Sequence, residues 1–374
     1  MKKRGILKIS AAAVLLWGCT AAPAEEQKEL IKYSNLSYDA GFDTVYAYTE
    51  YGTDEEAMKE NFETGTGMFS QCNALFDIYN SYEGVSGLKE INDNAGKAPV
   101  EVDPVLIGML KEAKNFSELT DGAFDITIGS ILKVWHNYRE EGIEENAAGR
   151  PGKVPSMEEL QEAAAHTGWS HVTIDEEKNT VYLDDPEMSL DAGGIAKGYA
   201  AEMIGQALDD RVSSYASINA GRNIRTVHTK ADGSDWRIGI VDPETGSSLL
   251  VISKPGSCSF VTSGDYERFY EGEDGTRYHH IIDPSTLMPA AYYRSVTIIT
   301  EDSSAADCLS TALFCLSVEE GRAVLQKYEQ QSGHTADAVW IMAKDKTQDT
   351  EGKDTDRYHI AYTEGLEGRI TWSS

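Results

Sequence analysis

The chain has 374 residues and carries 33 Lys and Arg against 62 Asp and Glu, a formal net charge of −29. Hydrophobic residues make up 41% and charged residues 25%, which is typical of a folded globular protein and excludes a disordered or fibrous one. The acidity argues against nucleic acid and anionic membrane surfaces as partners, because binding either needs clustered Lys and Arg.

The first eighteen residues have the pattern of a signal peptide. A basic start at residues 2–4 precedes an apolar run from Ile9 to Trp17, which is too short to cross a bilayer as a mature helix. The four residues that end at Cys19, Leu-Trp-Gly-Cys, resemble a bacterial lipobox. We therefore expect residues 1–18 to be removed and Cys19 to be lipidated, with palmitate among its acyl chains, before a linker over 19–40. Ordinary secretion with an accidental Cys is the alternative. The lipid anchor alone would hold the protein at the extracytoplasmic face of the bacterial cell membrane.

The predicted elements that follow alternate between hairpins and single helices. In chain order they are a strand at 46–53, helices at 56–75 and 104–119, a polar loop or insertion at 137–155, a hairpin of 172–174 with 181–183, a helix at 195–208, several strands between 216 and 300, a helix at 304–316, and a final hairpin of 339–342 with 359–362 around a mobile charged tip at 344–357. No internal repeat and no inter-domain linker after residue 30 is found. The mixture predicts a single large α+β domain over residues 41–374.

Besides Cys19, the chain has four cysteines, Cys72, Cys258, Cys308 and Cys315. Their spacings match no zinc pattern and contain no Cys-x-x-Cys pair. We expect buried free thiols.

A pair of glycines introduces one of the predicted helices. Asp191-Ala192-Gly193-Gly194 follows a strand, and Lys197 lies in the first turn of the helix. Glycines allow backbone to approach a ligand closely, and the N–H groups of a helix N-terminus can hold a phosphate. Because the protein is so acidic, an anionic substrate would need a local positively charged site of this kind. A plain strand–turn–helix with a surface Lys is the alternative.

Two further oxygen side chains share one face of a later helix. Asp307 and Thr311 are four residues apart, so a carboxylate and a hydroxyl could both bind a hard cation such as Mg²⁺. Alternatively, Asp307 caps its helix and Thr311 bonds back to the backbone.

Three other segments carry candidate polar groups. His279 and His280 are adjacent, so on a strand at most one faces a given site. His280 could act as an acid or base, or both histidines could be structural. Asp125, between apolar residues, could cap a turn or contact a ligand, and residues 218–224 read as a strand that ends in a Gly turn.

Together and in this order, these segments resemble the FAD:protein FMN transferase (ApbE) family, in its bacterial lipoprotein form. The resemblance runs from about Tyr51 to the C-terminal hairpin. Its most specific stretches are residues 190–199, 280–284 and 306–314, with support from 122–127 and Trp135, 236–240 and 262–268.

The resemblance implies an ApbE-like, T-fold-related domain that uses Mg²⁺ and takes FAD as its substrate. Such enzymes transfer FMN to a Thr or Ser hydroxyl of another protein, and AMP leaves. It also implies flavin-acceptor partners such as subunits of Rnf-type or sodium-pumping NADH:quinone oxidoreductases, and no nucleic acid.

The resemblance also assigns roles to residues. It implies metal ligands at Gly194 (through its carbonyl), Asp307 and Thr311, FAD contacts at Tyr51, Tyr82, Ala123, Phe124, Asp125, Asp191, Lys197 and Ile282, and proton transfer by His280 or Asp283.

Three positions depart from the family pattern. Arg222 stands where Gly is usual, Tyr51 where Met usually contacts the flavin, and residues 285–289 lack the Gly that normally follows the Thr. Because none of them touches the predicted metal pair, we expect activity to survive. Two other functions remain open, a Mg²⁺-dependent FAD pyrophosphatase that releases FMN and AMP, and a non-catalytic FAD-binding lipoprotein.

Overall fold

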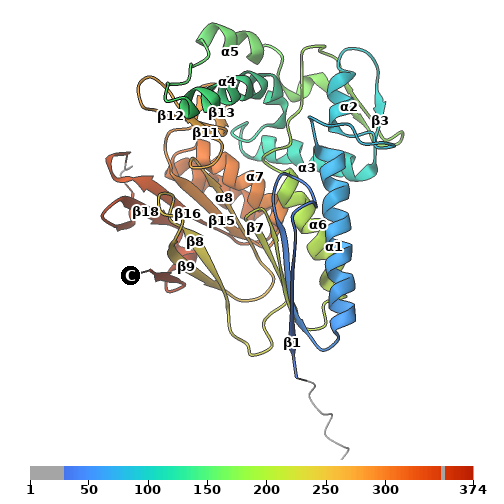
Figure 1. The fold of residues 1–374 in the computed structure, drawn as a ribbon, viewed down its shortest axis with the longest axis vertical. Coiled ribbons are helices and arrows are strands. Elements are labelled where there is room, and N and C mark those ends of the chain that lie inside the picture. Colours follow the sequence, from blue (N-terminus) through green and yellow to red (C-terminus); the bar gives the residue numbers. More distant parts are fainter. Residues whose placement is uncertain (1–28, 347–349, 374) are drawn as a thin grey trace, which may run out of the picture.

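A nine-stranded antiparallel sheet runs through the centre of the computed structural model, which describes residues 29–346 and 350–373 (Figure 1). In spatial order its strands are β1 (Ile31–Ser37), β2 (Tyr46–Gly52), β6 (Tyr215–Ala220), β7 (Asn223–Val227), β10 (Ser259–Gly264), β15 (Ser295–Thr300), β16 (Ala336–Ala343), β18 (Tyr358–Tyr362) and β17 (Lys353–Asp354). Burial alternates along β2 and β6, as expected for strands whose two faces meet different environments.

Four helices cover one face of this sheet. They are α1 (Glu55–Phe76), α6 (Ala196–Asp209), α7 (Ser303–Cys315) and α8 (Val318–Ser332). Helix α1 packs on β1 and β2, α6 on β6 and β7, α7 on β10 and β15, and α8 on β16, so the helices follow the strand order. Asp54 and Asp302 start α1 and α7, since each side chain accepts backbone N–H groups of the first turn.

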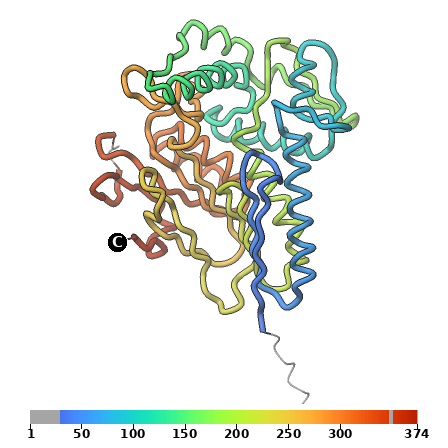
Figure 2. The backbone as a smooth tube through the Cα atoms, viewed as in Figure 1, coloured from blue at the N-terminus to red at the C-terminus, as the bar shows by residue number. Residues whose placement is uncertain are grey.

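A small sheet lies on the other face of the large one. Its strands are β8 (Trp236–Val241), β9 (Ser248–Lys254) and β19 (Ile370–Trp372). Leu250 and Ile252 of β9 belong to a core cluster with Phe260, Ile299 and Ile341 of the large sheet. The molecule is therefore layered as helices, large sheet and small sheet, as Figure 2 also shows.

Shorter elements gather at one end of these layers, where α4 and α5 lie at the top of Figures 1 and 2. They are α2 (Leu88–Asp93), β3 (Val100–Glu101), α3 (Pro104–Leu119), α4 (Gly129–Ala147), α5 (Met157–Ala164), β4 (Val172–Asp175), β5 (Thr180–Leu183), β11 (Phe269–Glu271), β12 (Arg277–His279), β13 (Ile282–Asp283) and β14 (Met288–Pro289), with 3₁₀ turns at Ile126–Ile128 and Trp169–His171. Two other 3₁₀ turns, Lys344–Lys346 and Glu364–Leu366, follow β16 and β18.

The direction of α6 brings its first turn to this end of the molecule. Tyr199, in that turn, packs edge-on against Phe76 at the end of α1, with ring centroids 5.9 Å apart. The other end of α6 lies by His228, whose Nε2 is 3.4 Å from the Asp209 carboxylate. The Gly193-Gly194 turn thus faces the short elements.

Most of the predicted elements are confirmed. The structure has a single α+β domain, with helices at 55–76, 104–119, 196–209 and 303–315 and the two predicted hairpins. The four described cysteines are buried free thiols, as predicted. Within the described ranges, no helix is both long and apolar enough to cross a membrane.

Two predictions about local structure were wrong. The polar stretch 137–155 is not a loop throughout, because α4 continues to Ala147; its buried face is made of small residues and Trp135, and Gly142 packs on the Tyr270 ring. The predicted linker 19–40 also extends too far, since residues 31–37 pair with β2 as an edge strand. In the predicted charged tip, 344–346 form a 3₁₀ turn and 353–354 a strand, and 347–349 lie outside the described residues.

Candidate active site at the α6–α7 junction

The start of α6 is fixed against α7 by one carboxylate. Asp307 Oδ2 accepts the backbone N–H of Gly198 at 2.8 Å, and Asp307 is 4% exposed. A Cβ on Gly198 would lie 2.5 Å from Asp307 Cβ and would also strike the Ser303 carbonyl, so only glycine permits this approach. Helix α7 itself begins at Asp302, so Asp307 caps α6 and not its own helix.

The second predicted metal ligand of α7 meets the glycine turn. A Cβ on Gly194 would lie 3.0 Å from Thr311 Oγ1 and 3.1 Å from the Phe124 ring. Because Gly194 has no side chain, its backbone can lie this close to the Thr311 hydroxyl. The structure brings all three predicted metal-binding residues, Gly194, Asp307 and Thr311, to one place.

The donor set at this place fits Mg²⁺. A carboxylate, a hydroxyl and a backbone carbonyl are hard oxygen ligands, and Mg²⁺ is usually held by one or two carboxylates together with substrate phosphates and waters. Among the described residues no group of three or more His, Cys, Asp or Glu forms a complete metal cage. Such a site would depend on substrate oxygens to complete it.

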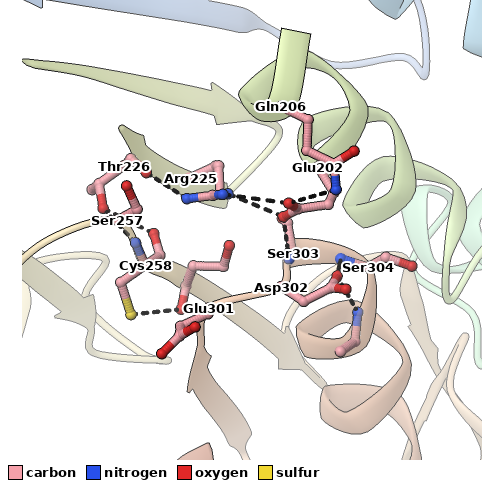
Figure 3. Close-up of polar contacts among 12 residues, drawn as sticks. Glu202, Gln206, Arg225, Thr226, Ser257, Cys258, Glu301, Asp302, Ser303 and Ser304 are labelled. Atoms are coloured by element: carbon pink, nitrogen blue, oxygen red, sulfur yellow. Dashed lines mark hydrogen bonds and ion pairs between the residues drawn. The ribbon is translucent and has the colours of Figure 1, made fainter. Parts of the chain in front are cut away.

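A buried ion pair holds the beginning of α7 against α6 (Figure 3). Glu202 of α6 accepts Arg225 Nε at 3.0 Å and the backbone N–H of Ser303 at 2.8 Å. Glu202 and Arg225 are 9% and 8% exposed. The Asp302 side chain accepts the N–H groups of the next two residues. The position of Asp307 on α7 therefore depends on contacts a full turn before it.

The N-terminus of α6 has no side-chain cap of its own on the preceding residue. Asp191 accepts the Gly193 N–H at 2.8 Å, and its own N–H donates to the Ile126 carbonyl, which ties the turn to the segment after Phe124. Burial raises the pKa of Asp191. Lys197 lies half-buried in the first turn. The Gly193 and Gly198 N–H groups are bonded to Asp191 and Asp307, and the positive end of α6 with the Lys197 cation favours an anionic ligand.

The two candidates for proton transfer have different surroundings. His280 Nδ1 donates to the Glu267 carbonyl at 3.2 Å. Burial lowers the pKa of His280 to about 3, and neighbouring charges that include Arg268, Arg139 and Lys197 lower it further. Asp283 instead accepts the N–H and hydroxyl of Ser285, at 2.8 and 2.7 Å.

Asp283 is also further from the metal-binding residues. It acts electrostatically on Cys315, which lies eight residues after Asp307, about 12 Å along α7. Asp283 therefore stays in its own turn, whereas the Lys197 charge acts on His280.

Several of the other residues predicted to contact FAD also have structural roles in the fold. Asp125 starts the 3₁₀ turn that follows it by accepting the Thr127 N–H at 2.8 Å, and burial raises its pKa. Phe124 is buried beside Gly194, and Ala123 packs on the same core. Ile282 is 4% exposed in a core under α4, so its backbone is the part available to a ligand.

Tyr82 lies in the loop after α1, beside a strained turn. Its hydroxyl donates to Asp77 at 2.8 Å and accepts from Asn73, whose Oδ1 also accepts the Phe42 N–H at 2.6 Å. Phe42 has a φ of 56°, which is unusual for a bulky residue. Strained backbone of this kind often marks a functional site. Sequence reasoning missed Phe42, which Asn73 links to Tyr82.

Tyr51 does not join this site, contrary to the prediction. It pairs with Tyr215 across the sheet and its ring stacks on the Tyr215 ring, 4.7 Å between centroids. Both border a separate hollow of about 440 Å³ with Trp236. Tyr51 lies towards the C-terminal end of α6, whose fourteen residues separate its two ends by about 20 Å.

A cavity of about 690 Å³ opens beside Asp191, within the range of small-molecule sites. It is lined by Tyr79, Ser130 and His136 among others. The Tyr79 ring lies 5.3 Å from the His136 ring. Part of this wall is formed by α4, through Gly129, Ser130, Leu132, Lys133, His136 and Asn137, and no helix was predicted there from the sequence.

The model of the ApbE family matches residues 42–335. The chain belongs to the ApbE family. The match begins at Phe42 and covers every element that forms the α6–α7 junction, which confirms the predicted family.

Relatives in the ApbE family share the full extent of the fold. A FAD:protein FMN transferase of Vibrio cholerae is 31% identical over 325 residues, 86% of this chain and 91% of that protein. One of Treponema pallidum is 36% identical over 65% of this chain and 68% of its own length. The crystal structure of the ApbE protein of Thermotoga maritima superposes with a TM-score of 0.73 at 30% identity, covering 91% of this chain and 99% of that one.

Two departures from the ApbE pattern place a non-glycine residue in left-handed backbone. Arg222, where Gly is usual, has a φ of 74° in the turn between β6 and β7, and Leu287, which takes the place of the missing Gly, has a φ of 62°. Both adopt a backbone that favours glycine. The Arg222 guanidinium pairs with Glu267 at 2.7 Å, so it braces the loop that holds His280.

Proposed function

We propose that this ApbE-family chain is a Mg²⁺-dependent flavin transferase that moves FMN from FAD to a Thr or Ser hydroxyl of a second protein. The acceptor oxygen forms a bond to the FMN phosphorus, the anhydride bond breaks, and AMP leaves. The observation that carries the proposal is the junction itself, where Gly194, Asp307 and Thr311 meet at the start of α6.

The oxygen atoms of Gly194, Asp307 and Thr311 would hold the metal. When bound, Mg²⁺ supplies a Lewis acid that neutralises charge on the phosphoryl oxygens. The Lys197 ammonium, with the positive end of the α6 dipole, binds and orients the diphosphate.

His280 is the residue that we assign to proton transfer. Because its Nδ1–H donates to the Glu267 carbonyl, Nε2 keeps a free lone pair, and the low pKa keeps the ring neutral. The acceptor hydroxyl proton moves to this Nε2 as the oxygen attacks phosphorus. Bound phosphates counter the neighbouring cations and make the ring a stronger base.

The decisive experiment mixes the protein with FAD, Mg²⁺ and a purified flavin-acceptor domain. We expect a covalently fluorescent acceptor and one AMP for each flavin transferred. FMN and AMP release with an unlabelled acceptor would establish a pyrophosphatase instead. FAD binding without consumption would establish a flavin carrier.

We also propose a lipid anchor at Cys19 and an extracytoplasmic location, which the signal-like residues 1–18 support. These residues lie outside the described part of the chain. Cys19→Ser is expected to move the protein from the membrane fraction to the soluble fraction. Acceptors of the Rnf type or of sodium-pumping NADH:quinone oxidoreductases are the first to test.

A further inference from the structure

Three cationic side chains from separate parts of the chain lie near enough to His280 for their charges to act on it. They are Arg139 of α4, Lys197 of α6 and Arg268 of the loop between β10 and β11, and the charges of all three act on the imidazole. Arg139 and Arg268 also act on Asp191 and on Tyr79. The cluster therefore spans the space between the start of α6 and the cavity wall formed by α4.

These cations have no carboxylate partner at hydrogen-bond distance. Among the residues that the structure describes, no hydrogen bond or ion pair engages the Lys197 or Arg268 side chain. Arg139 donates to His136 Nδ1 at 2.8 Å, and its closest ion-pair carboxylate, the exposed Glu140, is 3.8 Å away. Asp191 forms no ion pair with either arginine and instead accepts the Gly193 N–H.

This lack of partners is unusual for buried arginines in this protein. The Arg139 side chain is 15% exposed. Arg225 and Arg294 are comparably buried, at 10% and 17%, and each donates to a carboxylate at 3.0 or 2.9 Å. With 62 acidic residues against 33 basic ones, carboxylates are not scarce. Arg268 is exposed and Lys197 half-buried. The mostly buried Arg139 guanidinium lacks a close counter-ion, which is costly, so its position suits an anion that comes from outside the chain.

The loop that carries Arg268 is held in a strained shape. Arg268 has a φ of 47°, in the left-handed region. The residue before it fixes the loop twice, because the Glu267 carbonyl accepts from His280 and its carboxylate pairs with Arg222. Strain of this kind persists only where surrounding contacts enforce it. These contacts place Arg268 beside His280.

We propose that Arg139 and Arg268 are substrate-binding residues that hold the diphosphate of FAD together with Lys197. The inference rests on the proposed function for the identity of the anion. A diphosphate carries two negative charges, and the departing AMP phosphate gains charge as the anhydride bond breaks. Guanidinium groups suit both states, because each presents several N–H donors to phosphate oxygens. Helix α4 thus contributes to chemistry as well as to the cavity wall.

The test compares ligands with and without phosphate, at a fixed Mg²⁺ concentration. Affinities of riboflavin and FAD are measured by flavin fluorescence, and that of ADP by competition with FAD. In Arg139→Gln and Arg268→Gln we expect affinity for FAD and ADP to fall about tenfold or more. Riboflavin affinity is expected to stay within about twofold, and Arg139→Lys to recover part of the loss.

Arg150→Gln is the matched control, since it removes the same charge from an exposed arginine just after α4 that pairs with Glu145. Equal losses for riboflavin and ADP would overturn the inference, because Arg139 would then only support the fold. Unchanged ADP affinity in both variants would also overturn it. These are equilibrium affinities, so a wild-type protein that binds FAD without transferring flavin would contradict the proposed function alone.

Discussion

The Asp307 carboxylate caps α6 through the Gly198 N–H at 2.8 Å, so a candidate metal ligand on one helix also fixes the start of its neighbour. The two roles can be separated by substitution. Asp307→Asn keeps an acceptor oxygen for Gly198 and removes the charge. We expect the Asn variant to keep its unfolding temperature within a few degrees and to lose about a hundredfold or more in turnover.

Asp307→Ala is expected to lose both roles, with about 1 kcal/mol of stability from the missing cap as well as the activity. Turnover is followed as AMP release across a Mg²⁺ titration, and stability by thermal unfolding. An Asn variant with wild-type turnover at every Mg²⁺ concentration would disprove the metal assignment.

Gly194→Ala tests the close approach at the glycine turn. The new methyl would meet Thr311 Oγ1 at 3.0 Å and the Phe124 ring at 3.1 Å, so we expect turnover to fall at least tenfold while the protein stays folded. Gly67→Ala in α1 is the control, because no atom lies within 4 Å of its new methyl. It is expected to leave turnover unchanged and to stabilise the helix by about 0.5–1 kcal/mol. Equal activity in the two variants would contradict the model of the turn.

The buried pair Glu202–Arg225 predicts a strong coupling in stability. Removing either partner alone leaves a buried charge, which costs about 3–5 kcal/mol, whereas removing both costs less than the sum. Urea unfolding of Glu202→Ala, Arg225→Ala and the double variant measures this. Asp93→Asn, which breaks the exposed pair with Lys89, is expected to cost under about 1 kcal/mol. Additive losses in the double variant would show that the pair does not act as a unit.

Glu112 predicts how stability changes with pH. Burial raises its pKa to about 7, despite a hydrogen bond from Ser304. Between pH 4.5 and 7 the folded state holds a proton that the unfolded state has released, so stability is lost as pH rises through this window. The loss is at most about 3 kcal/mol. Glu112→Gln is expected to raise the unfolding temperature at pH 8 and to change it little at pH 4.5. A larger gain at pH 4.5 than at pH 8 would contradict the assignment.

Tyr82 and Tyr51 give opposite predictions for flavin binding. Tyr82 lies beside Phe42 at the end of the molecule where α6 begins, and Tyr51 lies about 20 Å away along that helix. We expect Tyr82→Ala to weaken FAD binding about tenfold, as for the loss of an aromatic contact. Tyr51→Ala is expected to leave the affinity unchanged. Fluorescence titration of both variants measures these FAD affinities. A larger loss in Tyr51→Ala than in Tyr82→Ala would support the prediction from sequence that Tyr51 contacts the flavin.

The candidate metal-binding residues could be picked out from sequence because they lie in short contiguous motifs. The four-residue spacing alone places Asp307 and Thr311 on one helix face. The glycine pair that includes Gly194 indicates the start of a helix. The dual role of Asp307 could not be predicted, since the Gly198 N–H is 109 residues away in the chain.

Helix α4 shows why the basic cluster was missed. Between Asn137 and Ala147 its residues are mostly polar, and Gly142 interrupts them, which favours a loop. The helix forms because Trp135 and Gly142 pack on the core below, and Gly142 provides the space that the Tyr270 ring fills. Packing on the core outweighs the weak local preference of this segment and makes it helical. The same packing sets the position of Arg139. The positive φ of Leu287 could not be predicted from sequence either, because a non-glycine residue there gives no sign of a left-handed turn.

The cations around His280 lie within a protein of net charge −29. Beyond about 10 Å, the Debye length at 0.1 M salt, an approaching FAD dianion meets mainly the repulsion of the acidic exterior. Within that distance, Arg139, Lys197 and Arg268 attract it. Added salt should therefore raise the association rate constant of FAD and raise its dissociation rate constant as well. An equilibrium titration would partly hide these two opposing effects, and stopped-flow fluorescence would separate them.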